Sequence, residues 1–255
     1  MSSISVVRLL GIALLAGAVA ACSSPGPGAP IAERDPFENT NRRFHKANVF
    51  LDRNLVRPAA QGYDFVTPAT FQFLLGNAID HLDSVGDFAN YVIQGDVDNA
   101  LVTFGRFVVN TVLGAGGLLD PATEFDLPKG ETDFGVTLGK YGVGEGAYLV
   151  LPLLGPSTTR DAWGSIVDRT AFNPRFYVGV FVDGTIVDAA LPAATVFEVV
   201  EARARNADLV DDILYESADS YVTLRSIFLQ RRDALIGGTE ASEDLPDIFD
   251  EENSN

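Results

Sequence analysis

The sequence predicts a mostly α-helical protein in which helices alternate with glycine- and proline-rich irregular loops. Asp35-Pro36-Phe37-Glu38 is a helix-start pattern, with a capping aspartate, proline at the first position and glutamate three residues on. Apolar residues at helical spacing follow it to about Asn54, and Thr67-Pro68 opens a second segment of the same kind. From Gly114 to Pro156, the density of glycine and proline instead indicates tight turns and irregular backbone.

A third helix is predicted from Val97 to Leu113, with Asp96 as its cap and Gly114 at its end. A helix that is apolar on nearly every face is buried in a protein core or lies in lipid. This one, at about 17 residues, is at the lower limit for a membrane span, and Arg106 and Asn110 argue against an isolated span. Taken alone, it is best interpreted as a core helix. Its most continuous apolar face consists of Leu101, Phe104, Val108 and Val112.

Shorter helices are predicted in the C-terminal half. Ser157 or Thr158 caps one of them. The apolar stretch over residues 176–200 is interrupted so often that it predicts two short segments rather than one span. Two amphipathic helices are expected over residues 198–216 and 221–236, the second capped by Asp219.

The N-terminus has the pattern of a lipoprotein export signal. Arg8 is followed by an apolar run to Ala21, which has the length of a signal-peptide core rather than of a membrane span. Small residues precede Cys22, the single cysteine of the chain, and lipoprotein processing attaches a diacylglycerol to a cysteine in this position before cleavage. We therefore predict a signal peptide over residues 1–21 and a mature chain that is held to a membrane by acyl chains on Cys22.

The rest of the chain divides into three parts. Residues 22–34 are predicted to form a flexible tether, because the stretch from Ser24 to Pro30 is rich in proline and glycine. Residues 35–236 form the helical domain, and residues 237–255 form an acidic tail that we expect to be disordered. Ser23, rather than an aspartate, follows the lipidated cysteine, which is the pattern of lipoproteins sorted to the outer membrane.

The net charge and the mean hydropathy limit the classes of partner that the chain is expected to bind. The formal net charge is −17, so the phosphates of nucleic acid would be repelled. Simple electrostatic adhesion to anionic headgroups is disfavoured for the same reason. Hydrophobic residues nevertheless make up 47% of the chain and the mean hydropathy is +0.14, which is high for an acidic protein and suggests contact with lipid.

No catalytic or metal-binding pattern is apparent. His45 and His81 are the only histidines, neither lies near a nucleophile motif, and the Gly-x-Ser-x-Gly pattern of serine esterases is absent. Surface or capping roles are expected for both histidines. Two isolated histidines and a lipidated cysteine do not make a zinc set. We therefore predict a protein that is not an enzyme and that uses no cofactor or metal.

Several stretches, in one order along residues 35–236, resemble the MlaA (VacJ) family of outer-membrane lipoproteins. Each piece is common by itself, but the ordered set is specific. The pieces are Asp35-Pro36-Phe37-Glu38, Val56-Arg57-Pro58, Gln94-Gly95-Asp96, Asn110-Thr111-Val112-Leu113-Gly114, Gly116-Gly117-Leu118-Leu119-Asp120, Lys140-Tyr141-Gly142-Val143-Gly144, Thr159-Arg160-Asp161, Glu201-Ala202-Arg203-Ala204, Asp219-Ser220-Tyr221 and Gln230-Arg231-Arg232. Family members more often have Asp-Pro-Tyr where this chain has Asp219-Ser220-Tyr221.

The resemblance implies a ring-like assembly of amphipathic and apolar helices, embedded in the inner leaflet of the outer membrane and enclosing an amphipathic channel. It also implies a function. Proteins of this family remove mislocalised phospholipids from the outer leaflet and pass them to a soluble periplasmic carrier, which maintains lipid asymmetry, and they associate with trimeric porins. The partners expected from the resemblance are therefore phospholipid, a trimeric porin and a periplasmic lipid carrier.

Two hypotheses remain open. In the first, the chain is a phospholipid-transport lipoprotein, and Arg106 and Asn110, four residues apart, face the channel. Replacing Asn110 with leucine would then change stability little. The alternative for Arg106 is an ion pair with a carboxylate in the protein core. The second hypothesis is a non-catalytic structural or assembly lipoprotein of the outer membrane, whose apolar helices hold partner proteins.

Overall fold

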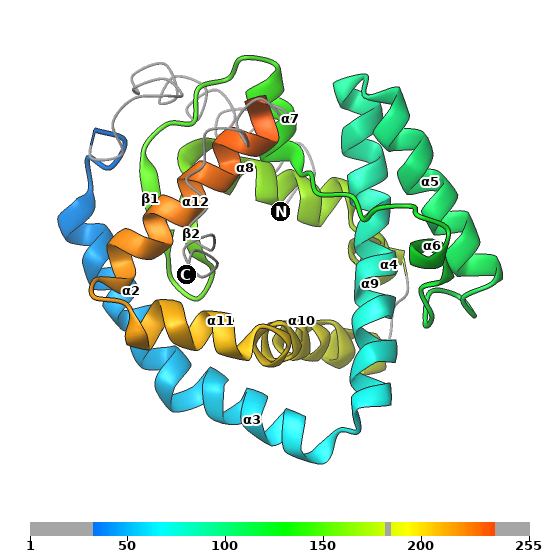
Figure 1. Cartoon of the computed structure of the whole chain (residues 1–255), viewed down its shortest axis with the longest axis horizontal. Coiled ribbons are helices and arrows are strands. Elements are labelled where there is room, and N and C mark those ends of the chain that lie inside the picture. The colour runs from blue at the N-terminus through cyan, green and yellow to red at the C-terminus, as the bar shows by residue number, and fades with distance from the viewer. Residues whose placement is uncertain (1–32, 182–184, 238–255) are drawn as a thin grey trace, which may run out of the picture.

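The computed structural model describes residues 33–181 and 185–237 (Figure 1). Within these ranges the predicted mostly α-helical fold is confirmed. The predicted signal peptide, the lipidation site Cys22, most of the tether and the acidic tail beyond Gly237 lie outside the described residues.

The N-terminal helix is longer than the sequence predicts. Helix α2 (Glu38–Leu51) continues through a π-helical turn, η1 (Asp52–Val56), directly into α3 (Arg57–Val66). Pro58 does not end the helix, and it stands in the first turn of α3, directly after the π-helical turn. Asp35 does not cap α2, so that part of the prediction is wrong. The residue before α2 is Phe37, which makes no side-chain capping bond.

Helices α4 (Ala69–Gln94) and α5 (Val97–Val112) are the second and third helices that the sequence predicts, and they pack together as a helical hairpin. Gly95 ends α4 in the left-handed region, with a φ of 73°, and this sharp reversal requires glycine. Asp96 then caps α5, because its carboxylate accepts a hydrogen bond of 3.2 Å from the backbone N–H of Asn99.

The glycine-rich middle of the chain holds more regular structure than expected. It contains the short helices α6 (Pro121–Glu124) and α7 (Phe134–Lys140) and an antiparallel hairpin of β1 (Tyr148–Leu151) and β2 (Gly155–Thr158). Strands of four residues are too short to show a clear alternation of apolar and polar residues, which explains why the sequence did not reveal them. Thr158 caps α8 (Thr159–Val167) as predicted, whereas Ser157 lies in β2.

The C-terminal part follows the predicted order with different boundaries. A π-helical turn, η2 (Asp168–Phe172), leads to α9 (Pro174–Phe181) and α10 (Thr185–Arg205). These are the two predicted segments, but α10 continues past Pro192 and includes the start of the helix expected from Glu198. The remaining elements are α11 (Ala207–Asp211), a π-helical turn η3 (Asp212–Glu216) and α12 (Ser220–Gly237), the last capped by Asp219.

The small apolar core is reinforced by buried ion pairs. Tyr148, Val150, Tyr221 and Leu229 form the apolar cluster, where the β hairpin meets α12. Asp35 lies beside it and accepts hydrogen bonds from Tyr221 and Arg225 of α12 and from Asn41 of α2. Buried charges persist only when they are paired and hydrogen-bonded in this way, so these contacts attach the N-terminal segment to α12.

Arg34 belongs to the folded domain, although the sequence assigns it to the tether. It is 2% exposed and forms ion pairs with Glu145 at 2.5 Å and with Asp233 at 2.7 Å. Its partners are 111 and 199 residues away in sequence, so no local pattern indicates them.

In Figure 1, α2 lies on the left, α3 runs along the bottom, α4 and α5 form the right-hand side, and α7 and α8 lie in the upper part. Helix α10 packs on α3, and α12 packs on α7. No helix in the described part of the chain is both long enough and apolar enough to cross a membrane.

Candidate functional site

Helix α5 has a buried polar face and an exposed apolar face, which is the reverse of the arrangement usual in a water-soluble protein. Its buried face carries Thr103, Arg106 and Asn110, each no more than 6% exposed. The apolar face that the sequence predicts is turned outward, and its members are between 41% and 71% exposed. An exposed contiguous apolar face marks contact with a partner or with lipid. The outward residues are Val97, Leu101, Phe104, Val108 and Val112.

Arg106 and Asn110 project from the same side of α5, as predicted, and both bind Asp120. Arg106 forms an ion pair with the Asp120 carboxylate and donates a hydrogen bond to the Leu127 carbonyl oxygen. The Asn110 side chain donates to Asp120 at 2.8 Å and accepts from the backbone N–H of Ala122 at 3.0 Å. The alternative considered for Arg106, an ion pair with a carboxylate in the protein, is therefore confirmed.

Asp120 is held in its ionised form by this arrangement. Burial alone would raise its pKa, but hydrogen bonds from Thr123 and Asn110 and the charge of Arg106 together lower the pKa below its usual value. The contacts of Arg106 and Asn110 with Asp120 therefore fix the loop after α5 to the helix. It also reaches open space, because Arg106, Asn110 and Asp120 line one wall of a polar cavity of about 480 Å³.

The two histidines are buried, so the expected surface or capping roles are wrong. His81 of α4 stacks on Phe107 of α5, with ring centroids 4.5 Å apart and an interplanar angle of 6°. Gly117, at a φ of 91°, lies so close that a Cβ atom there would collide with the His81 ring. His45 shares a 2.8 Å hydrogen bond with Ser220 at the start of α12. Both imidazoles act in packing between elements.

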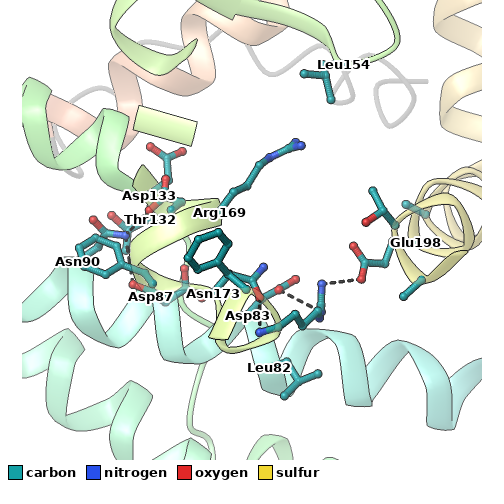
Figure 2. Close-up of a pocket in the computed structure, with 18 of the residues that line it drawn as sticks. Leu82, Asp83, Asp87, Asn90, Thr132, Asp133, Leu154, Arg169, Asn173 and Glu198 are labelled. Atoms are coloured by element: carbon teal, nitrogen blue, oxygen red, sulfur yellow. Dashed lines mark hydrogen bonds and ion pairs between the residues drawn. The ribbon is translucent and has the colours of Figure 1, made fainter. Parts of the chain in front are cut away.

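A larger cavity of about 680 Å³, which we call the main cavity, lies between α4, η2, α9 and α10 (Figure 2). Its volume is in the range of roughly 300–1,000 Å³ that is usual for small-molecule sites. The walls are apolar in part, with Leu154 at the tip of the β hairpin on one side. The other apolar wall residues include Leu82, Phe172, Phe176 and Val199.

Acidic side chains dominate the charge of the main cavity. Its lining holds five of them, together with the two bases Arg169 and Arg175. Arg175 is neutralised, since it pairs with Glu198 at 2.5 Å and with Asp83 at 3.3 Å. The five acids are Asp83, Asp87, Asp133, Asp168 and Glu198.

Two of these acids form no ion pair among the described residues. Burial and the neighbouring charge of Asp83 raise the pKa of Asp87 to about 7. Burial also raises the pKa of Asp168, although this carboxylate accepts hydrogen bonds from the backbone N–H of Phe134 and from Asn90. Asp133 differs from both, because it pairs with Arg232 of α12 at 2.5 Å.

Arg169 is the one base of this lining without a partner. It is exposed and forms no hydrogen bond or ion pair with any described residue. Figure 2 shows its side chain extending into the open space on the side of Leu154. No motif in the sequence singles out Arg169, Asp87 or Asp168. The four-residue spacing of Asp83 and Asp87 on α4 was the available signal, since it places both carboxylates on one helix face.

Comparison with known proteins identifies the family. The family model described as MlaA lipoprotein matches residues 33–235, which is nearly all of the described chain. The chain belongs to the MlaA lipoprotein family. MlaA of Haemophilus influenzae, an intermembrane phospholipid transport system lipoprotein, is 32% identical over 249 residues, which cover 94% of this chain and 95% of that protein. The Escherichia coli K12 MlaA of the same description is 33% identical, over 92% of this chain and 90% of its own length.

A solved MlaA-family structure, described as the structural basis for maintenance of bacterial outer membrane lipid asymmetry, has the same fold. It aligns with a TM-score of 0.67 at 32% identity, over 79% of this chain and 98% of the solved chain. The family resemblance found in the sequence is therefore confirmed. These MlaA relatives are named for transport and not for catalysis.

Proposed function

We propose that this chain is the outer-membrane lipoprotein of an intermembrane phospholipid transport system. It removes mislocalised phospholipids from the outer leaflet, passes them to a periplasmic carrier and so maintains lipid asymmetry. It does this without bond chemistry. The observation that carries the proposal is the inverted amphipathicity of α5, because an outward apolar face with a buried polar face suits a helix that contacts lipid.

Large apolar side chains are also exposed on other helices. Residues on α2, α3 and α4 and in η1 add large apolar side chains to the exposed surface, at positions that a water-soluble helix normally gives to polar residues. These residues are Phe44, Phe50, Leu55, Phe65, Phe71 and Phe73, which are between 40% and 90% exposed. We infer that these side chains contact lipid acyl chains within one leaflet of the membrane.

The arrangement of the helices supports a ring-like shape. In Figure 1, α2, α3, α4 and α5 follow the outer edge of the view, and α10, α11 and α12 lie on their inner side. The main cavity is lined by residues of α4 and α10. In this proposal the cavity is part of an amphipathic route, with apolar outer faces in lipid and charged groups within. Arg106 and Asn110 border the smaller polar cavity and line this route at its edge.

The anchor and the partners complete the proposal. Acyl chains on Cys22 hold the protein at the periplasmic leaflet of the outer membrane, a trimeric porin lies beside it, and a soluble periplasmic lipid carrier receives the phospholipid. These assignments rest on the lipoprotein junction before Cys22 and on the family.

Membrane embedding is tested with the Cys22→Ser protein expressed without its signal segment. We expect it to bind phospholipid vesicles, and we expect Leu101→Asp/Val112→Asp to weaken this binding at least about tenfold. Each aliphatic side chain contributes about 1.5–3 kcal/mol when it is fully removed from water. Leu101 and Val112 are 63% and 71% exposed, so their replacement does not disturb the core.

The matched control is Asn39→Asp/Thr40→Asp, which adds the same charge at exposed polar positions of α2 and should leave vesicle binding nearly unchanged. If the Cys22→Ser protein remains monomeric in buffer and does not bind vesicles, the result would favour the alternative of a structural or assembly lipoprotein. In cells that lack the native gene, the wild-type chain should restore a low level of phospholipid in the outer leaflet. The Leu101→Asp/Val112→Asp variant should fail to do so although it is present at normal abundance.

A further inference from the structure

We propose that the main cavity selects zwitterionic over anionic phospholipid headgroups, with the headgroup phosphate at Arg169 and the headgroup ammonium beside Asp87 and Asp168. This inference rests on the proposed function, since it takes phospholipid as the cargo. It goes further by naming the headgroup class and the side chains that recognise it.

The first support is the unpaired cation. Arg175, the other base in the lining, is bound to two carboxylates, whereas Arg169 has no partner among the described residues and extends into the cavity (Figure 2). A guanidinium presents a planar set of donors that matches the oxygens of a phosphate. Arg169 is therefore the group in this cavity that is available to an anion.

The second support is the excess of negative charge. After Arg175 and Arg232 have paired with Asp83, Glu198 and Asp133, Asp87 and Asp168 remain without a base. A headgroup that carries only negative charge would be attracted by Arg169 but repelled by the carboxylates of Asp87 and Asp168. A headgroup with a phosphate and an ammonium joined by an ethylene bridge complements both signs, because opposite charges attract across a partly dry cavity.

The third support is the shape and polarity of the walls. The apolar residues Leu154, Phe172, Phe176 and Val199 border the same space as the charged groups. A cavity of about 680 Å³ has room for a headgroup and for the start of the acyl chains along these residues. The apolar wall gives no preference between headgroups, so selectivity depends on the charged side chains.

The test uses the full acylated chain in detergent at pH 8, where Asp87 is mostly ionised. The protein is incubated with equimolar phosphatidylethanolamine and phosphatidylglycerol of identical acyl chains, freed of unbound lipid and analysed by mass spectrometry. We expect phosphatidylethanolamine to be enriched by roughly two- to tenfold, the effect of one or two partly solvated charge contacts. Equal retention of the two lipids would overturn the headgroup proposal and leave the transport function intact. Retention of neither would contradict the proposed function itself.

Two variants should change the retention of the two lipids in different ways. Arg169→Gln should lower the retention of both lipids, because it removes the phosphate partner that they share. Asp87→Asn should lower the retention of phosphatidylethanolamine more than that of phosphatidylglycerol, because it removes a partner of the ammonium, and so it should reduce the enrichment. Arg43→Gln is the control, because this exposed arginine of α2 is outside the cavity lining. Wild-type retention by Arg169→Gln, or unchanged enrichment by Asp87→Asn, would overturn the assignment.

Discussion

Arg106 of α5 and Asp120 of the following loop form a nearly buried ion pair, and Asn110 binds the second carboxylate oxygen of Asp120. The residues that the transport hypothesis places at a channel thus attach the loop to α5. This contact decides what a substitution there does.

Asn110→Leu should destabilise the protein, contrary to the expectation drawn from the sequence alone. The leucine leaves the backbone N–H of Ala122 and one oxygen of Asp120 without partners, and each unsatisfied buried group costs about 1–3 kcal/mol. Chemical denaturation of the purified protein measures the loss. Asn39→Leu, at an exposed position of α2, should cost much less. Unchanged stability, together with a defect in lipid asymmetry, would instead support a channel-lining role without a structural one.

Removing Arg225 should be more damaging than removing an exposed arginine. Arg225 pairs with Asp35 at 2.6 Å, and the side chains are 8% and 0% exposed. Arg225→Met leaves the Asp35 carboxylate buried without its cation, which costs about 3–5 kcal/mol of unfolding free energy. Arg231→Met is the comparison, because Arg231 and its partner Glu131 are 67% and 63% exposed, and it should cost less than about 1 kcal/mol. Similar losses for the two variants would show that the Asp35 cluster is not a main source of stability.

Asp87 should make stability depend on pH in the direction opposite to most carboxylates. Its pKa is raised from the ordinary 3.8 to about 7, so between these values the folded state binds more protons than the unfolded state. The contribution is therefore fully present below about pH 4 and is lost as the pH rises through 7. Asp83 and Asp168, whose pKa values are also raised by burial, act in the same direction.

The measurement is the denaturation midpoint of the wild type and of Asp87→Asn at pH 5 and pH 8. We expect the difference between the two proteins to shift in favour of Asp87→Asn as the pH increases, since asparagine cannot ionise. A wild-type protein that gains stability relative to Asp87→Asn over this interval would contradict the raised pKa.

Local patterns in the sequence were sufficient for the elements that depend on neighbouring residues. The caps at Asp96, Thr158 and Asp219 all depend on contacts within a few positions. The apolar stripe of α5 was also readable, because helical periodicity places its members on one face whatever lies outside. The ordered motifs were enough for the family.

Which charged side chains form ion pairs and which remain unpaired depends on packing between elements that are distant in the sequence. Arg34 reaches Asp233 across 199 residues, and Asp35 reaches Arg225 across 190, so periodicity and capping rules carry no information about either pair. The same holds for the burial of His81 against Phe107 and for the main cavity, whose walls come from helices that are distant in sequence. Local spacing and ordered motifs were enough to predict most of the helices, the apolar face of α5 and the family. That this face of α5 is exposed, and not part of a core, depends on how the helices pack. The fold decided that Arg169 lacks a partner while Arg175 has two, because ion pairing depends on distances in space that the chain acquires only when α4, α9 and α10 pack together.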